Sequence, residues 1–175
     1  MLDIQDRKSL LISKYGLDCQ PYNTSQINVT WETCSLRSWL NNAFLAEAFS
    51  DDEKSQIPVI TIKADKNPIY YNTNPGNDTS DQVFLLSVPE VDEFFSAEEE
   101  GFCDLTGYAS NKIQYLFQNN ARKPNSSAWT WWLRTPGSMP NLAVVARSRG
   151  EYNSNGLLVN KQDVAVRPAI WVNWE

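Results

Sequence analysis

The 175-residue chain contains no histidine, and this absence excludes more chemistry than any other feature of its composition. Without imidazole, no Ser-His-Asp or Cys-His arrangement can form, and metal sites that depend on histidine are excluded as well. Cysteine is also scarce: Cys19, Cys34 and Cys103 form no CxxC pair, and the last third of the chain has no thiol. We expect three buried, reduced thiols, with a single Cys19–Cys34 bridge as the alternative.

Long apolar runs and an excess of positive charge are lacking too. No stretch approaches the roughly 18 apolar residues of a membrane span, and residues 1–16 lack the apolar core of a signal peptide. The sequence therefore predicts a cytoplasmic protein as encoded, without membrane insertion, although a partner could carry it to a phage particle or a cell surface. The formal net charge of −6 and the pI near 4.7 argue against nucleic acid as a partner, because binding it requires clustered Lys and Arg.

What is present fits one compact domain. Hydrophobic residues make up 42% of the chain, and no Gly-, Ser- or Pro-rich linker interrupts it, so residues 1–175 are expected to share one core. Helical and extended patterns alternate in the first half, whereas short runs separated by glycine predict antiparallel strands beyond Asn125. The predicted fold class is α+β, with two short helices packed on an irregular, mostly antiparallel sheet.

Local signals place the individual elements. Apolar residues at spacings of three and four from Leu36 to Phe44 predict an amphipathic helix with Thr33 or Ser35 as its N-cap. Ser50-Asp-Asp-Glu53 and Ser87-Val-Pro-Glu90 each have the form of a capping box at a helix start. Strands are expected at 8–15, 59–64, 82–86, 129–134 and 142–146, with a surface loop at 65–81 and tight turns at Gly150 and Asn155-Gly156.

Several polar clusters could bind a cation, but each favours a structural interpretation. The acidic runs 51–53 and 98–100 lack the ligand order of an EF-hand loop, so we interpret them as solvated helix starts or loops. Residues 74–78 offer oxygen ligands, yet the same residue types are ordinary turn formers. The sequence therefore predicts no metal site and no cofactor.

Tryptophan and arginine side chains near the C-terminal third also have two interpretations. Trp129, Trp131 and Trp132 could stack on sugars or bases, but alternation along a strand places Trp132 opposite the other two, so we expect most of these rings in the core. Arg134 and Arg167 lie close to prolines in apolar sequence. This setting favours buried bidentate pairs with carboxylates over substrate clamps.

Five segments along the chain carry a family resemblance. They are LLISKYGLDCQPYN (10–23), TWETCSLRSWLNNAFLAEAFSDDEKSQI (30–57), TSDQVFLLSVPEVDEFF (79–95), WWLRTPG (131–137) and VAVRPAIWVN (164–173). Together they resemble a family of bacterial, phage and archaeal domains whose C-terminal part has a C-type-lectin-like fold. The WWLR strand and the closing VRPA-x-W are also similar to the variable proteins of diversity-generating retroelements and to the formylglycine-generating-enzyme fold. The resemblance implies a lectin-like scaffold, with 129–175 as the variable, ligand-binding region.

In such variable proteins the segment between WWLR and VRPA differs most, and here it comprises residues 137–163. The small or apolar positions of the family's framework are matched by Ala143, Ala146, Gly150, Gly156 and Val159, so the resemblance implies that their neighbours point outward. Among these neighbours, Arg147, Arg149 and Tyr152 are the expected energetic anchors. The candidate ligand-binding residues are Met139, Asn141, Val145, Arg147, Arg149, Glu151, Tyr152, Asn153, Asn155, Leu157, Asn160 and Lys161.

We expect a monomeric, non-catalytic module, and the resemblance implies that it displays a diversified surface to a ligand, here a protein of unknown identity. No cysteine follows Cys103, although formylglycine-generating enzymes work through C-terminal cysteines, and the Glu-Pro-Asn or Gln-Pro-Asp loop of calcium-dependent lectins is absent. Without the resemblance, the residue types of 137–163 fit a recognition surface and an ordinary solvated sheet edge alike. The alternatives are calcium-independent carbohydrate binding, a structural domain of a phage or cell-surface assembly, and a carboxylate-based hydrolase.

Overall fold

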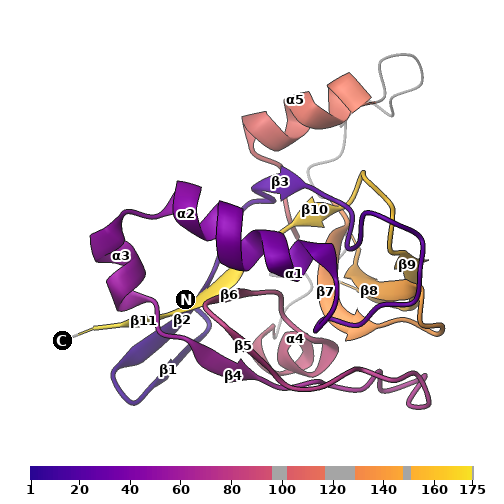
Figure 1. Cartoon of the computed structure of the whole chain (residues 1–175), viewed down its shortest axis with the longest axis horizontal. Helices are drawn as coiled ribbons and strands as arrows, with labels where there is room; N and C mark the ends of the chain where they lie inside the picture. Colours follow the sequence, from indigo (N-terminus) through magenta and orange to yellow (C-terminus); the bar gives the residue numbers. More distant parts are fainter. Residues whose placement is uncertain (96–101, 117–128, 148–150, 175) are drawn as a thin grey trace.

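The computed structural model describes residues 1–95, 102–116, 129–147 and 151–174. Along the chain, the helices come before most of the long strands (Figure 1). The helical segments are α1 (Ser35–Trp39), the π-helical η1 (Leu40–Phe44), α2 (Leu45–Ala48), α3 (Asp51–Gln56), α4 (Val88–Phe94) and α5 (Gly107–Leu116). The strands are β1 (Asp3–Gln5), β2 (Lys8–Ile12), β3 (Asp18–Cys19), β4 (Ile60–Ile62), β5 (Thr79–Asp81), β6 (Val83–Phe84), β7 (Trp131–Pro136), β8 (Leu142–Ala146), β9 (Tyr152–Leu158), β10 (Ala165–Val166) and β11 (Ala169–Asn173).

The strands of the described residues form three sheets. Their orders are β1-β2-β11-β6, β3-β10-β7-β8-β9 and β4-β5. Neighbouring strands within these sheets run antiparallel except β10 and β7, which are parallel. The first sheet joins the two ends of the chain, since β2 pairs with β11. This architecture confirms the predicted α+β class and its mostly antiparallel pairing.

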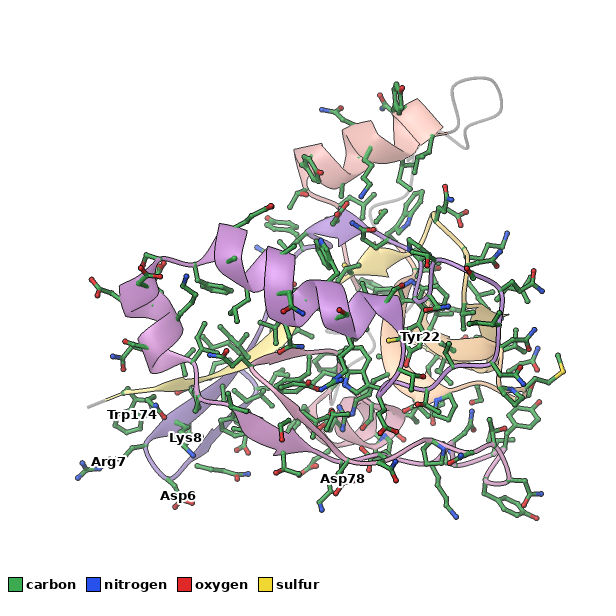
Figure 2. The ribbon with its side chains drawn as sticks, viewed as in Figure 1. Asp6, Arg7, Lys8, Tyr22, Asp78 and Trp174 are labelled. Atoms are coloured by element: carbon green, nitrogen blue, oxygen red, sulfur yellow. The ribbon has the colours of Figure 1, made fainter. Side chains whose placement is uncertain are left out.

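Aromatic rings fill the core around β7. Every residue of β7 and β8 is buried, and Trp131 and Trp132 are both 0% exposed although they point to opposite faces of β7. Tyr22, which Figure 2 shows where α1 meets β7, packs edge-on against Trp132 with 5.6 Å between ring centroids. Its hydroxyl donates to the carbonyl oxygen of Arg134 at 3.0 Å. Both faces of β7 are therefore covered, and its tryptophans are structural.

Helix starts follow local chemistry closely. At α3 and α4 the predicted capping boxes are present, with Ser50 and Glu53, and Ser87 and Glu90, each satisfying the other's backbone amide. At α1 the N-cap is neither Thr33 nor Ser35. Cys34 takes that place, its sulfur accepting from the amide of Arg37.

Other sequence-based boundaries need correction. The chain forms more helices than the two predicted, and α5 was missed because only Ala109 and Ile113 of this helix are buried, too few to produce a clear apolar period. The strand predicted at 8–15 is β2, which ends at Ile12, and β1 before it was not predicted. The turn-rich stretch 65–81 ends in β5. The acidic run 98–100 and the turn at Gly150 lie outside the described residues.

The three cysteines are free and buried, as predicted, so the alternative Cys19–Cys34 bridge does not form. Burial raises the pKa of the Cys19 and Cys34 thiols to about 12 and that of Cys103 to about 11. Among the helices that the structure describes, none is long and apolar enough to cross a membrane.

Candidate ligand-binding surface

The candidate segment 137–163 consists of one buried strand that supports one edge strand. All five residues of β8 are buried, whereas β9 is mostly half-buried and ends the five-stranded sheet. The two strands pair from Leu142 opposite Leu158 to Ala146 opposite Tyr152. Side chains of β9 and of the flanking residues Arg147, Glu151 and Lys161 therefore reach the surface, while β8 lies buried beside them.

Two glycines allow β9 to lie close to β8 and to the residue that follows β7. Gly156 has a φ of 86° and lies inside β9, so the predicted tight turn at Asn155-Gly156 is wrong. A Cβ atom on Gly156 would lie 2.7 Å from the carbonyl oxygen of Ala143, and one on Gly137 would lie 2.5 Å from that of Asn155. The amide of Ser138 donates to this same Asn155 oxygen at 3.0 Å. Only glycine permits such a close backbone approach, which fixes the course of the edge strand.

A buried asparagine holds the loop 65–78 against this site. Asn67 is 0% exposed, and its Nδ2 donates to the carbonyl oxygens of Pro136 at 2.9 Å and Ser154 at 2.8 Å. Its Oδ1 accepts from the amides of Ile69 and Tyr70, both at 3.0 Å. Sequence reasoning missed Asn67, because an asparagine before proline in a turn-rich stretch gives no signal of burial.

The two arginines differ in their surroundings. Arg134 is 4% exposed and forms the predicted bidentate pair, because both terminal nitrogens bind the Glu90 carboxylate; its Nη2 also binds Asp65 Oδ2 at 2.8 Å. Arg167 donates from Nε to the carbonyl oxygen of Ser13 at 2.8 Å, and its guanidinium lies 5.1 Å from the Trp131 ring centroid. Desolvation lowers the pKa of Arg167. Both side chains belong to the scaffold.

The twelve candidate residues differ in exposure. The Val145 side chain was expected to point outward, but it is 1% exposed, because β8 is covered on both faces. Arg149 lies outside the described residues, whereas the framework positions Ala143, Ala146, Gly156 and Val159 are all buried. The exposed candidates are Met139, Arg147, Glu151, Asn155 and Lys161. The half-buried candidates are Asn141, Tyr152, Asn153, Leu157 and Asn160.

Tyr152 connects the edge strand to helix α4. Its hydroxyl donates to Asp92 Oδ2 at 3.3 Å. Desolvation and the neighbouring Asp92 carboxylate both raise the pKa of Tyr152, so the phenol stays protonated and keeps this donor at neutral pH. Within the ranges that the structure covers, no group of three or more Cys, Asp or Glu side chains is arranged to hold a metal ion.

Comparison with known proteins places the chain in a family. A family model described as "Domain of unknown function (DUF6273)" matches residues 6–174. The chain belongs to this family. No curated protein and no solved structure matches it. The matched residues of the chain run from just before β2 to just after β11. They therefore include both the buried framework and the candidate surface.

Proposed function

We propose that this DUF6273 domain is a monomeric, non-catalytic binding module with a C-type-lectin-like scaffold. It presents the outer side chains of 137–163 to a protein ligand, in the manner of the variable proteins of diversity-generating retroelements. The observation that carries the proposal is the separation within this segment: the described framework positions are buried, whereas Met139, Arg147, Glu151 and Lys161 are exposed. Exposed positions on a buried support accept exchange without loss of the core.

A preorganised backbone makes such a surface effective. Gly137, Gly156 and Asn67 hold the edge strand through close contacts and hydrogen bonds, so binding requires little ordering of the main chain. Arginine and tyrosine contribute most to protein interfaces, because they combine large contact area with directed hydrogen bonds. Arg147 is exposed and Tyr152 is half-buried, so both are accessible anchors; replacing an anchor should weaken binding by about 1–3 kcal/mol.

The two carboxylates that bind Arg134 of β7 favour this role over hydrolysis. Asp65 and Glu90 converge on Arg134, which binds both. A carboxylate-based hydrolase needs one carboxyl group as acid and another as base or nucleophile, free to meet a substrate. Here the two groups stabilise a buried cation that joins the loop 65–78, α4 and β7.

Surface display of a designed library tests the proposal. Met139, Arg147, Glu151 and Lys161 are randomised together in the full chain, and the library is selected against ovalbumin and against lysozyme. We expect folded members that bind one probe specifically with micromolar or better affinity. A matched library randomises Glu47, Asp52, Asn111 and Gln114, which are also exposed but lie on helices. Equal enrichment from both libraries, or none from the first, refutes the proposal.

The diversification part of the proposal has its own test in the DNA beside the gene. A near-identical repeat of the segment encoding 129–175, differing at adenines and accompanied by a reverse transcriptase gene, is the expected finding. Without that repeat, the diversification part of the proposal fails, and the binding module alone remains to be tested by the library.

A further inference from the structure

Four segments from three separate parts of the chain meet at the end of the molecule that carries β9 (Figure 1). The amide of Val29 donates to the carbonyl oxygen of Pro140 at 3.0 Å, and that of Asn23 to Val159 at 2.8 Å. Asn67 joins its loop to Ser154 of β9. We call residues 20–31, 66–77, 137–146 and 152–162 together the four-segment surface. Arg7 and Trp174, labelled in Figure 2, lie at the other end of the view.

The four-segment surface differs in charge from the rest of the chain. The full sequence has 21 Asp and Glu residues and a net charge of −6, yet these four segments contain no carboxylate side chain and two lysines, Lys66 and Lys161. Both lysines are exposed. Five carboxylates directly adjoin the segment ends: Glu32, Asp65, Asp78, Glu151 and Asp163. Glu32 accepts hydrogen bonds from Asn77, Asp65 binds Arg134 and Asp78 binds Lys63. Glu151 is exposed, as are the cations Arg147 and Lys161. An acidic partner therefore meets less repulsion here than the net charge suggests.

Exposed apolar and aromatic side chains concentrate on the same segments. Ile27 is 57% exposed, Ile69 61%, Tyr71 64% and Met139 53%, and Tyr70 is 38% exposed beside them. Asparagine, serine and threonine make up much of the remainder. Tyrosine among short amide and hydroxyl side chains is the composition of antibody paratopes, because tyrosine has large contact area at low entropic cost.

We propose that ligand contact extends beyond 137–163 to the loops 23–29 and 66–77, and that the ligand is a protein with a carboxylate-bearing contact face. This inference rests on the proposed function. The two loops carry fixed contacts, Tyr70 and Tyr71 foremost, while the side chains of 137–163 set the choice of partner. Asn67 is a positioning residue, because its four hydrogen bonds hold the tyrosine loop against β9.

Binders selected from the library against ovalbumin, an acidic protein, provide the test. Tyr70→Ala/Tyr71→Ala is introduced into each binder, with Tyr108→Ala/Tyr115→Ala as the control. Tyr108 and Tyr115 are 67% and 73% exposed on α5, which lies outside the four-segment surface. We expect the dissociation constant to rise at least tenfold for the loop variant and less than twofold for the control. Tyr71→Ala alone, the more exposed position, is measured if the double variant fails to fold.

The charge part of the inference is tested by Lys66→Glu, with Lys14→Glu as the matched exposed control. We expect Lys66→Glu to slow association with ovalbumin, and the effect to shrink as salt is added. Binders that ignore both the loop tyrosines and Lys66 overturn the inference but leave the proposed function standing. A library without binders overturns both, and binders only to lysozyme, a basic protein, overturn the acidic-partner assignment.

Discussion

Replacing Gly156 with alanine should destabilise the domain substantially, because two costs coincide at this position. A φ of 86° lies in the left-handed region, where a residue with a Cβ is strained by about 1–3 kcal/mol. The new Cβ would also lie 2.7 Å from the carbonyl oxygen and 2.9 Å from the carbonyl carbon of Ala143, and 3.1 Å from the Cα of Gly137. These are backbone atoms of β8 and of the residue after β7, which cannot move aside as a flexible side chain would.

We therefore expect a loss of about 3 kcal/mol in the free energy of unfolding, or roughly 6–12 °C in melting temperature for a domain of this size. Urea titration followed by tryptophan fluorescence measures the loss. Gly107→Ala is the matched control, since its Cβ meets nothing within 4 Å. That variant should be neutral or slightly more stable. Equal stability of the two variants would refute the reasoning that close backbone approach fixes β9.

Three further predictions concern the scaffold. Asn67→Ala removes a buried amide with four hydrogen bonds and should lower the free energy of unfolding, measured by urea titration, by about 2–3 kcal/mol. The control Asn72→Ala, at an exposed position, should change it by less than about 0.5 kcal/mol. Glu90→Ala leaves buried Arg134 without its bidentate partner and should lower the free energy of unfolding by about 3 kcal/mol. Glu53→Ala, at the exposed capping box of α3, should cost much less. Similar losses for the two variants would contradict the importance of the buried pair. The raised pKa values of the three thiols predict no rapid reaction with Ellman's reagent at pH 8 until denaturant is added. They also predict stability that falls as pH rises above 9, where unfolded thiols ionise and folded ones stay protonated up to about 11–12.

Features set by neighbouring residues in sequence were predictable. The capping boxes at Ser50 and Ser87 need only residues three apart, and both are present. The buried pair of Arg134 followed from a permanent charge in apolar sequence, since such a charge requires carboxylate partners. The burial of Trp131 and Trp132 agrees with the expectation, drawn from strand alternation, that most of these rings lie in the core.

Features set by distant parts of the chain were not predictable. The family resemblance implied that Val145 points outward, but every residue of β8 is buried, which the spacing of small framework residues does not show. Asn67 is buried only because β7 and β9 offer it two carbonyl oxygens that lie 69 and 87 residues further along the chain. Gly156 has the sequence context of a turn, yet the close approach of Gly137 places it within a strand. These contacts shape the candidate surface, so its geometry required the structure.

The central claim is that the outer side chains of 137–163 can be exchanged while the buried aromatic support keeps its structure. The most direct measurement is the melting temperature of unselected library members randomised at Met139, Arg147, Glu151 and Lys161. The account predicts that most members melt within about 4 °C of the parent, because exposed substitutions each change stability by less than about 0.5 kcal/mol. Losses as large as that of Gly156→Ala in most members would contradict it.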